Sequence, residues 1–407
     1  MKKNKPEIRF KGFEEEWEEK SLEDLSSKVI EKNNTRTYET VFTNSAEFGI
    51  IDQKDYFDRN IANGENIQGY YVVMPNDFVY NPRISTSAPV GPINRNKLSY
   101  TGVMSPLYYV FRFKDEELDL SYLDYFFKSS AWHDFMFQNG NSGARSDRFS
   151  INDNVFVKLP IQHPKSEDEQ RKIGILLTTL DKLIRKLELK LEKLRNVKQS
   201  LLSQMFINVN GGGNAPLIRF KNYNDEWKMK KAVDIFIPFE EKNYPELPVL
   251  SANQELGMVA RSDIGFNVQH DHRNESGYKR VMPGQFVIHL RSFQGGFAHS
   301  EIEGITSPAY TIMGFKSSNE HYDRFWKYLL TSKDFIKSLE TVTYGIRDGR
   351  SIGFKDFGML VQTYPRREEQ KQIAKLLTIT DDYIKMNDAK LTKTRTMKQS
   401  LLQKMFA

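Results

Sequence analysis

The sequence predicts an α+β protein in which two mixed α/β globular domains alternate with two long helices, the second half duplicating the first. Two observations support this prediction. The motifs Lys-Gln-Ser-Leu-Leu at 198–202 and Met-Phe at 205–206 are repeated 398 − 198 = 200 positions later. Each copy lies at the end of a helix-like stretch. The segments between these stretches also repeat. A period of about 200 residues indicates domain duplication rather than a solenoid.

The repeat divides the chain into five segments. We predict a first globular domain over 1–165, a long helix over 166–206, a Gly-rich linker over 207–216, a second globular domain over 217–366 and a second long helix over 367–407. The three consecutive glycines of the linker are followed by neither a Lys-Ser/Thr pair nor a helix start, so we interpret them as a flexible connection rather than a phosphate loop.

Each globular domain opens with the word Ile-Arg-Phe-Lys, at 8–11 and 218–221, and a Glu-Trp pair follows. Short blocks of Val, Ile, Phe and Tyr broken by Gly, Pro, Asn and Ser then predict strands and turns. One helix is expected over 120–137, and its counterpart over 322–340. The offset between matching words falls from 210 to 200, as expected when residues are lost from loops.

The two long helices carry apolar residues at steps of three and four, with Lys and Glu elsewhere. About 40 residues at a rise of about 1.5 Å give each helix a length of about 60 Å. A helix of that length with such a stripe needs a partner. We therefore expect the two to pack as an antiparallel, pseudo-twofold coiled coil within the chain, rather than each only on its own domain. The expected packing residues are Leu180, Leu183, Leu187, Leu191, Leu194, Leu201, Ile384, Leu391 and Leu401.

Composition and charge limit the function further. The chain has 407 residues, no cysteine and a net charge of +6. With no disulfide framework, apolar leader or long apolar span, we expect a cytoplasmic protein. Lys+Arg minus Asp+Glu is 9 − 6 = +3 over 167–206 and 9 − 5 = +4 over 367–406, which leaves 6 − 7 = −1 for the rest. Polyanion contacts outside the helices therefore need local basic clusters, and the acidic segment 14–24 is a poor candidate.

Familiar catalytic motifs are absent from the sequence, including the P-loop, His-Glu-x-x-His and Gly-x-Ser-x-Gly. Asn-Pro-Arg at 81–83 lacks the second Pro and the aromatic residue of a methyltransferase loop. His-Asp-His at 270–272 has no defined third ligand for a metal. Glu-Glu-Lys at 240–242 lacks the upstream Asp of a nuclease site. We interpret these as turns and solvated loops and expect no catalytic residue, metal or cofactor in this chain.

Recognition of nucleic acid is the remaining chemistry. A Gly- and Arg-containing segment at 140–148 matches 344–350, so that Arg145 aligns with Arg347 and Arg148 with Arg350. Two Arg three residues apart can bracket a DNA backbone or bind guanine, whereas the alternative is that they pair with the neighbouring Asp147 or Asp348. Other polar residues in predicted turns are also candidates for DNA binding: Asn81, Arg83, Ser85, His289, Arg291 and Ser292.

These motifs resemble a known family. Two variable domains alternating with near-identical helices, the Pro then Glu-Gln entry to each helix (164, 169–170; 365, 369–370) and the Lys-Gln-Ser-Leu-Leu-x-x-Met-Phe endings are similar to the specificity subunit of bacterial type I restriction-modification enzymes. The resemblance implies a non-catalytic reader of double-stranded DNA that takes part in phage defence. Each domain would be a target-recognition domain reading one half of a split, asymmetric sequence.

The resemblance also implies partners. The helices would set the spacer and dock two methyltransferase subunits, which would use S-adenosylmethionine, and restriction subunits would supply translocation and cleavage with ATP and Mg. Such a protein would be bacterial, cytoplasmic and associated with the nucleoid through DNA. Two alternatives remain open from the residues: a reader that serves a methyltransferase without restriction, and a self-contained nuclease or methyltransferase with unfamiliar motifs.

Overall fold

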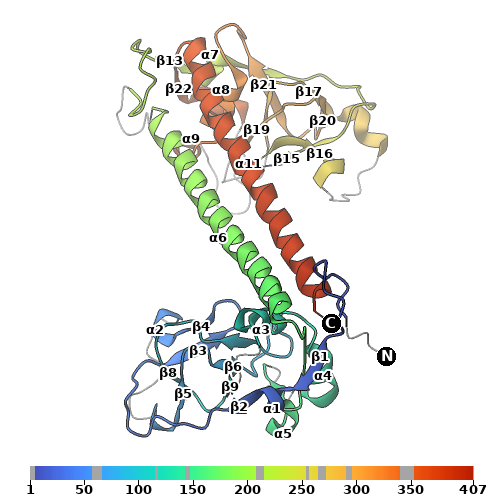
Figure 1. The fold of residues 1–407 in the computed structure, drawn as a ribbon. Helices are drawn as coiled ribbons and strands as arrows, with labels where there is room; N and C mark the ends of the chain where they lie inside the picture. The colour runs from blue at the N-terminus through green and yellow to red at the C-terminus, as the bar shows by residue number, and fades with distance from the viewer. Residues whose placement is uncertain are drawn as a thin grey trace. The chain divides into compact units, whose positions relative to one another are not determined.

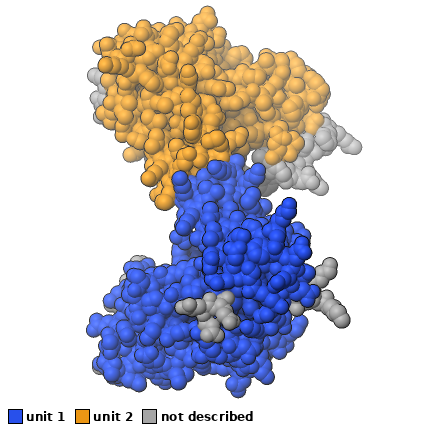
Figure 2. Space-filling view, in the orientation of Figure 1, with its two compact units in different colours: residues 1–188, 389–407 blue, residues 189–388 orange. Residues whose placement is uncertain are grey.

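The structure is a computed structural model that describes residues 5–56, 67–114, 118–142, 147–207, 215–253, 256–264, 272–289, 296–339 and 353–406. The chain forms two compact units, each with the first part of one long helix and the last part of the other (Figures 1 and 2). Unit 1 contains 1–188 and 389–407, and unit 2 contains 189–388. No helix among the described residues is both long and apolar enough to cross a membrane.

Unit 1 is built from a four-stranded antiparallel sheet with smaller sheets around it. The four strands run in the order β2 (Ser26–Lys28), β9 (Tyr109–Phe113), β6 (Phe78–Tyr80) and β7 (Ile93–Arg95). Two-stranded sheets pair β1 (Glu18–Ser21) with β12 (Pro160–His163), β3 (Phe42–Ser45) with β4 (Gly49–Asp52), β5 (Tyr71–Val73) with β8 (Gly102–Met104), and β10 (Asn141–Ser142) with β11 (Phe149–Ser150). Short helices are α1 (Leu22–Leu25), α2 (Gln53–Tyr56), α3 (Leu120–Phe126), α4 (His133–Asn139) and α5 (Asp153–Phe156).

Unit 2 repeats this strand order. Its four-stranded sheet runs β14 (Phe236–Phe239), β21 (Thr311–Phe315), β18 (Phe286–Ile288) and β19 (Phe297–His299). Two-stranded sheets pair β13 (Lys228–Lys231) with β22 (Val361–Tyr364), β15 (Leu250–Asn253) with β16 (Gly257–Ala260), and β17 (Lys279–Val281) with β20 (Gly304–Thr306). The helices are α7 (Ala232–Ile235), α8 (Asp323–Leu330), α9 (Lys333–Leu339) and α10 (Phe354–Met359). The matching topology confirms the α+β duplication.

The single helix expected over 120–137, and its counterpart over 322–340, are wrong in detail. Each is two short helices, α3 with α4 and α8 with α9. In unit 1 the break falls at Ser129, whose hydroxyl donates to the carbonyl of Phe126 at 2.7 Å. In unit 2 it falls at Thr331, whose hydroxyl donates to the carbonyl of Lys327 at 2.7 Å. Such local hydrogen bonds from Ser and Thr compete with continued helix.

The two long helices are α6 (Glu167–Gln204) and α11 (Arg367–Lys404), each of 38 residues. Their first turns explain the repeated Glu-Gln pair. The side-chain amide of Gln170 accepts from the Asp119 backbone N–H at 2.8 Å and donates to the Pro164 carbonyl at 2.9 Å. Gln370 makes the same bonds with Tyr322 and Pro365, both at 2.8 Å. The Gln side chain therefore fastens each helix to the domain before it.

Each unit contains a stretch of both helices, and these stretches run antiparallel. In unit 1, Lys398 pairs with Asp181 at 2.5 Å, and Arg395 with Glu188 at 2.6 Å. In unit 2, Lys198 pairs with Asp381 at 2.6 Å, and Arg195 with Asp388 at 3.4 Å. The residue numbers sum to 579 or 583 in both units (398 + 181 and 198 + 381; 395 + 188 and 195 + 388), so the register is the same.

A tyrosine from each domain joins this pairing. Tyr125 of α3 donates to Asp181 at 2.7 Å, and Tyr328 of α8 donates to Asp381 at 2.8 Å. Burial alone would raise the pKa of Asp181, but the hydrogen bonds from Lys398 and Tyr125 hold that pKa below its usual value. One carboxylate in each unit thus links a domain, the helix that follows it and the other long helix.

The expected helix-packing residues differ in burial. The buried ones are Leu180, Leu187, Leu191 and Leu391, and the half-buried ones are Leu183, Leu194, Leu201, Ile384 and Leu401. At three buried positions of α11 the matching residue is polar: Thr380, Asn387 and Thr394 stand where α6 has Leu. Their side chains donate to carbonyls one turn earlier in α11. Because these hydrogen bonds use the side-chain donors, the three polar residues can be buried without leaving a donor unpaired.

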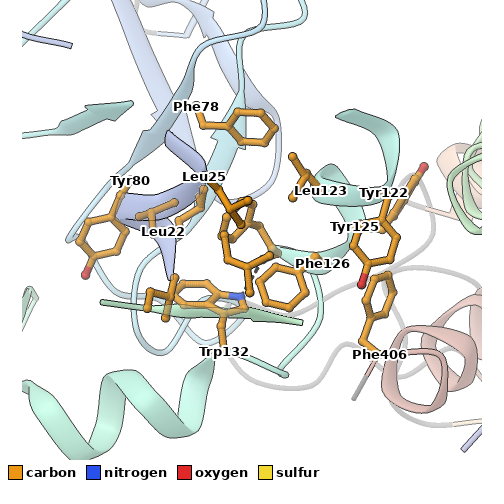
Figure 3. Close-up of a cluster of buried hydrophobic side chains, with 14 of the residues drawn as sticks. Leu22, Leu25, Phe78, Tyr80, Tyr122, Leu123, Tyr125, Phe126, Trp132 and Phe406 are labelled. Carbon is orange, nitrogen blue, oxygen red and sulfur yellow. Dashed lines mark hydrogen bonds between the residues drawn. The ribbon is translucent and has the colours of Figure 1, made fainter. Parts of the chain in front are cut away.

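The Met-Phe words that end both helices enter hydrophobic cores. In unit 1, Phe406 lies against Tyr122, with ring centroids 5.4 Å apart, and belongs to the aromatic cluster around Phe126 and Trp132 (Figure 3). In unit 2, Phe206 lies 5.3 Å from Phe325. The Met-Phe motif after α6 therefore belongs to the core of unit 2, and the motif after α11 belongs to the core of unit 1.

Unit 2 contains a buried histidine that is surrounded by aromatic rings. His321 is 5 % exposed and stacks on Phe315 at 5.0 Å, with Trp326 and Tyr364 also in contact. Burial lowers the pKa of its imidazole to about 4, and Lys228 and Lys230 lower it further against the opposite effect of Glu320. The unfolded chain takes up this proton near pH 6.5, so stability is full above that pH and falls below it.

We expect the free energy of unfolding to fall by about 2 kcal/mol between pH 7 and pH 5 because of this group. The measurement is urea unfolding at both pH values for the natural chain and for His321→Phe, which keeps the aromatic stack. The variant should lose about that much of the pH dependence. An equal pH dependence in the two proteins would contradict the assignment.

Candidate nucleic-acid interface

The first candidate segment begins where β6 ends in unit 1. The Asn81 amide donates to the Asn44 carbonyl at 2.8 Å, and its side-chain oxygen accepts from the Arg83 backbone N–H at 2.9 Å. Asn44 in turn donates to the carbonyl of Val79 at 2.7 Å and accepts from the Asn94 amide at 2.7 Å. Asn81 therefore positions the turn that presents Arg83, and is itself half-buried.

The segment that begins at Asn81 ends at a glycine that packs against Asn81. Gly91 has φ +86°, which is costly for residues with a side chain, and an added Cβ would lie 2.1 Å from the Asn81 carbonyl oxygen. Between these two residues, Ser85 closes a turn in which its backbone N–H and carbonyl both bond to Ala88, at 3.0 and 3.1 Å. The Ser85 hydroxyl lies 3.2 Å from that of Ser87. The turn is exposed at residues 85–87.

The second candidate segment meets the first. Arg148 and Arg83 form an isolated antiparallel β-bridge. Beside it, the Phe149 N–H donates to the Pro82 carbonyl at 2.7 Å, and the Ile84 N–H donates to the Asp147 carbonyl at 3.0 Å. Backbone hydrogen bonds thus bring two polar segments about 65 residues apart in sequence into one surface.

The charges of this surface suit an anionic ligand. The Arg83 guanidinium lies 3.4 Å from Asp147, with the two side chains 67 % and 49 % exposed. A solvent-exposed ion pair of this length contributes little to stability. Arg83 can therefore exchange Asp147 for another acceptor at a small cost in free energy. Arg148 adds a second positive charge next to it and leaves a net charge of +1 for the three side chains. Guanidinium groups can bind phosphate or the guanine edge bidentately.

In unit 2, His289 occupies the place of Asn81. It follows β18 as Asn81 follows β6, and its backbone N–H donates to the Gly296 carbonyl at 2.9 Å, as that of Asn81 donates to Pro92 at 2.9 Å. The half-buried imidazole lies 6.0 Å from the Tyr310 ring. The remaining expected binding residues lie outside the described residues: Arg145, Arg291, Ser292, Arg347 and Arg350.

Sequence reasoning missed the residues that support the turn. Asn44, Asn94 and Gly91 carry no motif, and their role depends on contacts over about 10 to 50 positions. The position of Asn81 at the end of a strand could have suggested that its side chain bonds the backbone two residues on, as it does at Arg83. Nothing in the sequence shows that its other partner is Asn44.

Comparison with known proteins gives the following matches. Residues 14–195 match the family model described as "Type I restriction modification DNA specificity domain". A crystal structure of a type I restriction-modification system S subunit from M. genitalium is similar along 99 % of both chains, with TM-score 0.57 and 13 % identity. A structure titled for complex assembly and conformational transition of the type I R-M system covers 98 % of both chains, with TM-score 0.54 and 14 % identity. At these identities, the structural likeness shows the shared fold.

Proposed function

We propose that this chain is a non-catalytic DNA specificity subunit of a type I restriction-modification system, as the match of residues 14–195 to that family's model supports, and that it reads a split DNA target, one half with each recognition domain. The observation that carries this proposal is the duplication. Both units have the same strand order, and the candidate segments leave equivalent strands, β6 and β18. Their residues differ, Asn81 against His289, so the two half-sites should differ as well.

We propose the following DNA-binding residues: Asn81, Arg83, Ser85, Arg145, Arg148, His289, Arg291, Ser292, Arg347 and Arg350. In unit 1 the proposal is supported by the bridge that joins Arg83 to Arg148 and by the exposed guanidinium of Arg83. Backbone-positioned Arg side chains on an exposed turn can both fix the register on DNA and contact base edges.

The long helices would set the number of unread base pairs and dock two methyltransferase subunits. This is supported by the repeated register, since a twofold repeat offers the same docking surface twice. The chemistry would reside in the partners, with S-adenosylmethionine in the methyltransferases and ATP with Mg in the restriction subunits. A base must leave the duplex to be methylated, so one subunit can hold the site while another acts. The protein would then be found in the bacterial cytoplasm, on the nucleoid.

A second candidate function is the specificity subunit of a methyltransferase without restriction subunits. The same repeat favours both candidates. Purification of the chain from its own cells distinguishes them by the presence or absence of an ATP-dependent nuclease subunit.

The proposed recognition by unit 1 is tested with Arg83→Ala and Arg148→Ala. If the side chain contacts a base, each change should weaken binding to the cognate target by about 1 to 3 kcal/mol, roughly 5- to 150-fold, and relax discrimination in one half-site alone. Titration with duplexes altered in either half-site measures both effects. Arg171→Ala removes an exposed Arg that pairs with Glu167 on α6 and serves as the matched control. Unchanged affinity and discrimination at low and moderate salt would remove Arg83 and Arg148 from the interface.

A further inference from the structure

Few exposed residues of the long helices are the same in both copies. Between 167–204 and 367–404, four positions carry an identical residue that is exposed in both: Lys190 and Lys390, Lys193 and Lys393, Arg195 and Arg395, and Gln199 and Gln399. The other positions between them that are exposed in both copies have changed, for example Glu192 to Thr392 and Asn196 to Thr396. Retention of these four positions therefore needs a reason.

Helix packing gives a reason for part of the set. Arg195 and Arg395 form the ion pairs with Asp388 and Glu188, and the nearby Leu191 and Leu391 are buried. Within the described part of the chain, the lysines at 190, 193, 390 and 393 form no ion pair. No carboxylate stands three or four positions from any of them, unlike Lys172, which pairs with Asp168.

The two lysines of each copy are also unfavourable for the helix itself. Lys190 and Lys193 are three residues apart on one face, as are Lys390 and Lys393. Like charges at this spacing repel each other and destabilise a helix. The same unfavourable arrangement in both copies indicates that the lysine pair binds something of opposite charge.

We infer that each lysine pair, Lys190 with Lys193 in unit 2 and Lys390 with Lys393 in unit 1, binds backbone phosphate of the unread DNA between the half-sites. This inference rests on the proposed function. Unread base pairs offer a protein their phosphates and no sequence information, and Lys neutralises phosphate without regard to sequence. The two strands of a duplex present the same phosphate chemistry twice, which matches one lysine pair in each copy.

A protein surface is the less suitable ligand. Protein interfaces are depleted in Lys and built around apolar and aromatic residues. The exposed apolar side chains of the helices are mostly not shared between the copies: Ile175 matches Lys375, and Met386 matches Lys186. Val197 and Met397, which are 50 % and 47 % exposed, are one apolar pair that is shared. The lysine pairs are therefore not the apolar centre of a protein-docking surface.

The test replaces all four lysines by Gln in the full chain assembled with its methyltransferase and measures DNA affinity against salt concentration. Removal of one phosphate contact should make the slope of log K against log salt less steep by about 0.9, so the four substitutions should reduce it by about 3 to 4. Preference for cognate over unrelated DNA should stay the same. The matched control removes four basic charges near the N-terminal ends of the long helices, with Arg171→Gln, Lys172→Gln, Lys371→Gln and Lys375→Gln, and should change the slope much less.

Two outcomes would overturn the inference: an unchanged slope, or an equal fall of the slope in the control variant. An unchanged slope together with loss of methyltransferase from the complex would make the lysines a protein-docking site. The same titrations separate this failure from failure of the proposed function. If the unsubstituted complex shows no preference for its cognate DNA, the proposed function fails. If that preference is present and the slope is unchanged, the lysine inference alone fails.

Discussion

Glu169→Ala is expected to destabilise unit 1 by about 3 to 5 kcal/mol, because it leaves a guanidinium without its buried partner. Arg9 and Glu169 form a bidentate pair, with Nε to Oε1 at 2.6 Å and Nη2 to Oε2 at 2.8 Å. The Glu169 side chain is fully buried and that of Arg9 is 14 % exposed. Urea unfolding of the natural and variant chains measures the loss.

The chain supplies two controls for this prediction. Glu369→Ala removes the equivalent partner of Arg219, bound by two 2.8 Å contacts, and should destabilise unit 2 by a similar amount. Glu167 lies two positions before Glu169 on α6 and forms an exposed ion pair with Arg171. Glu167→Ala should lower the free energy of unfolding by less than about 0.5 kcal/mol. Equal effects of Glu169→Ala and Glu167→Ala would contradict the role assigned to the buried pair.

Insertion of four residues into both long helices is expected to lengthen the unread spacer by between one and two base pairs, with both half-sites kept. Four residues add about 6 Å of helix, and a base pair rises about 3.4 Å. The insertions belong directly after Glu188 and directly after Asp388, because the ion pairs that fix the register within each unit then remain intact.

Insertion near Leu187 in α6 alone is the matched control. The pairs Lys398 with Asp181 and Lys198 with Asp381 share one register, and an insertion in one helix cannot keep both. We expect the single insertion to lower the midpoint of thermal unfolding, whereas the double insertion keeps it. If the double insertion left the spacer unchanged, the helices would not set its length.

The duplication and the long helices were predictable because periodic apolar residues and repeated words are local features of the sequence. The helices expected over 166–206 and 367–407 are found at Glu167–Gln204 and Arg367–Lys404. The core that receives the final Met-Phe was not predictable. An apolar word at a helix end indicates burial, but Phe406 enters the core of the first domain, and that contact spans most of the chain.

The candidate site was predictable only as separate polar turns. Glycines, Asn and Arg near strand ends identify exposed turns from local sequence. The meeting of Arg83 with Arg148 depends on the long-range bridge between their segments, and the support by Asn44 depends on another. Single-sequence patterns carry no information about such pairings. Asp147, which the sequence suggested as a local partner for Arg145 or Arg148, lies 3.4 Å from Arg83 instead, 64 positions away in the chain.

Base-resolution mapping of methylated DNA tests the central proposal most directly, in cells that carry this chain with its methyltransferase. Two unlike half-sites, separated by a constant number of base pairs of any sequence, are the predicted result. A single contiguous site, or two half-sites with a variable spacing, would contradict the account of two recognition domains joined by a fixed helix pair.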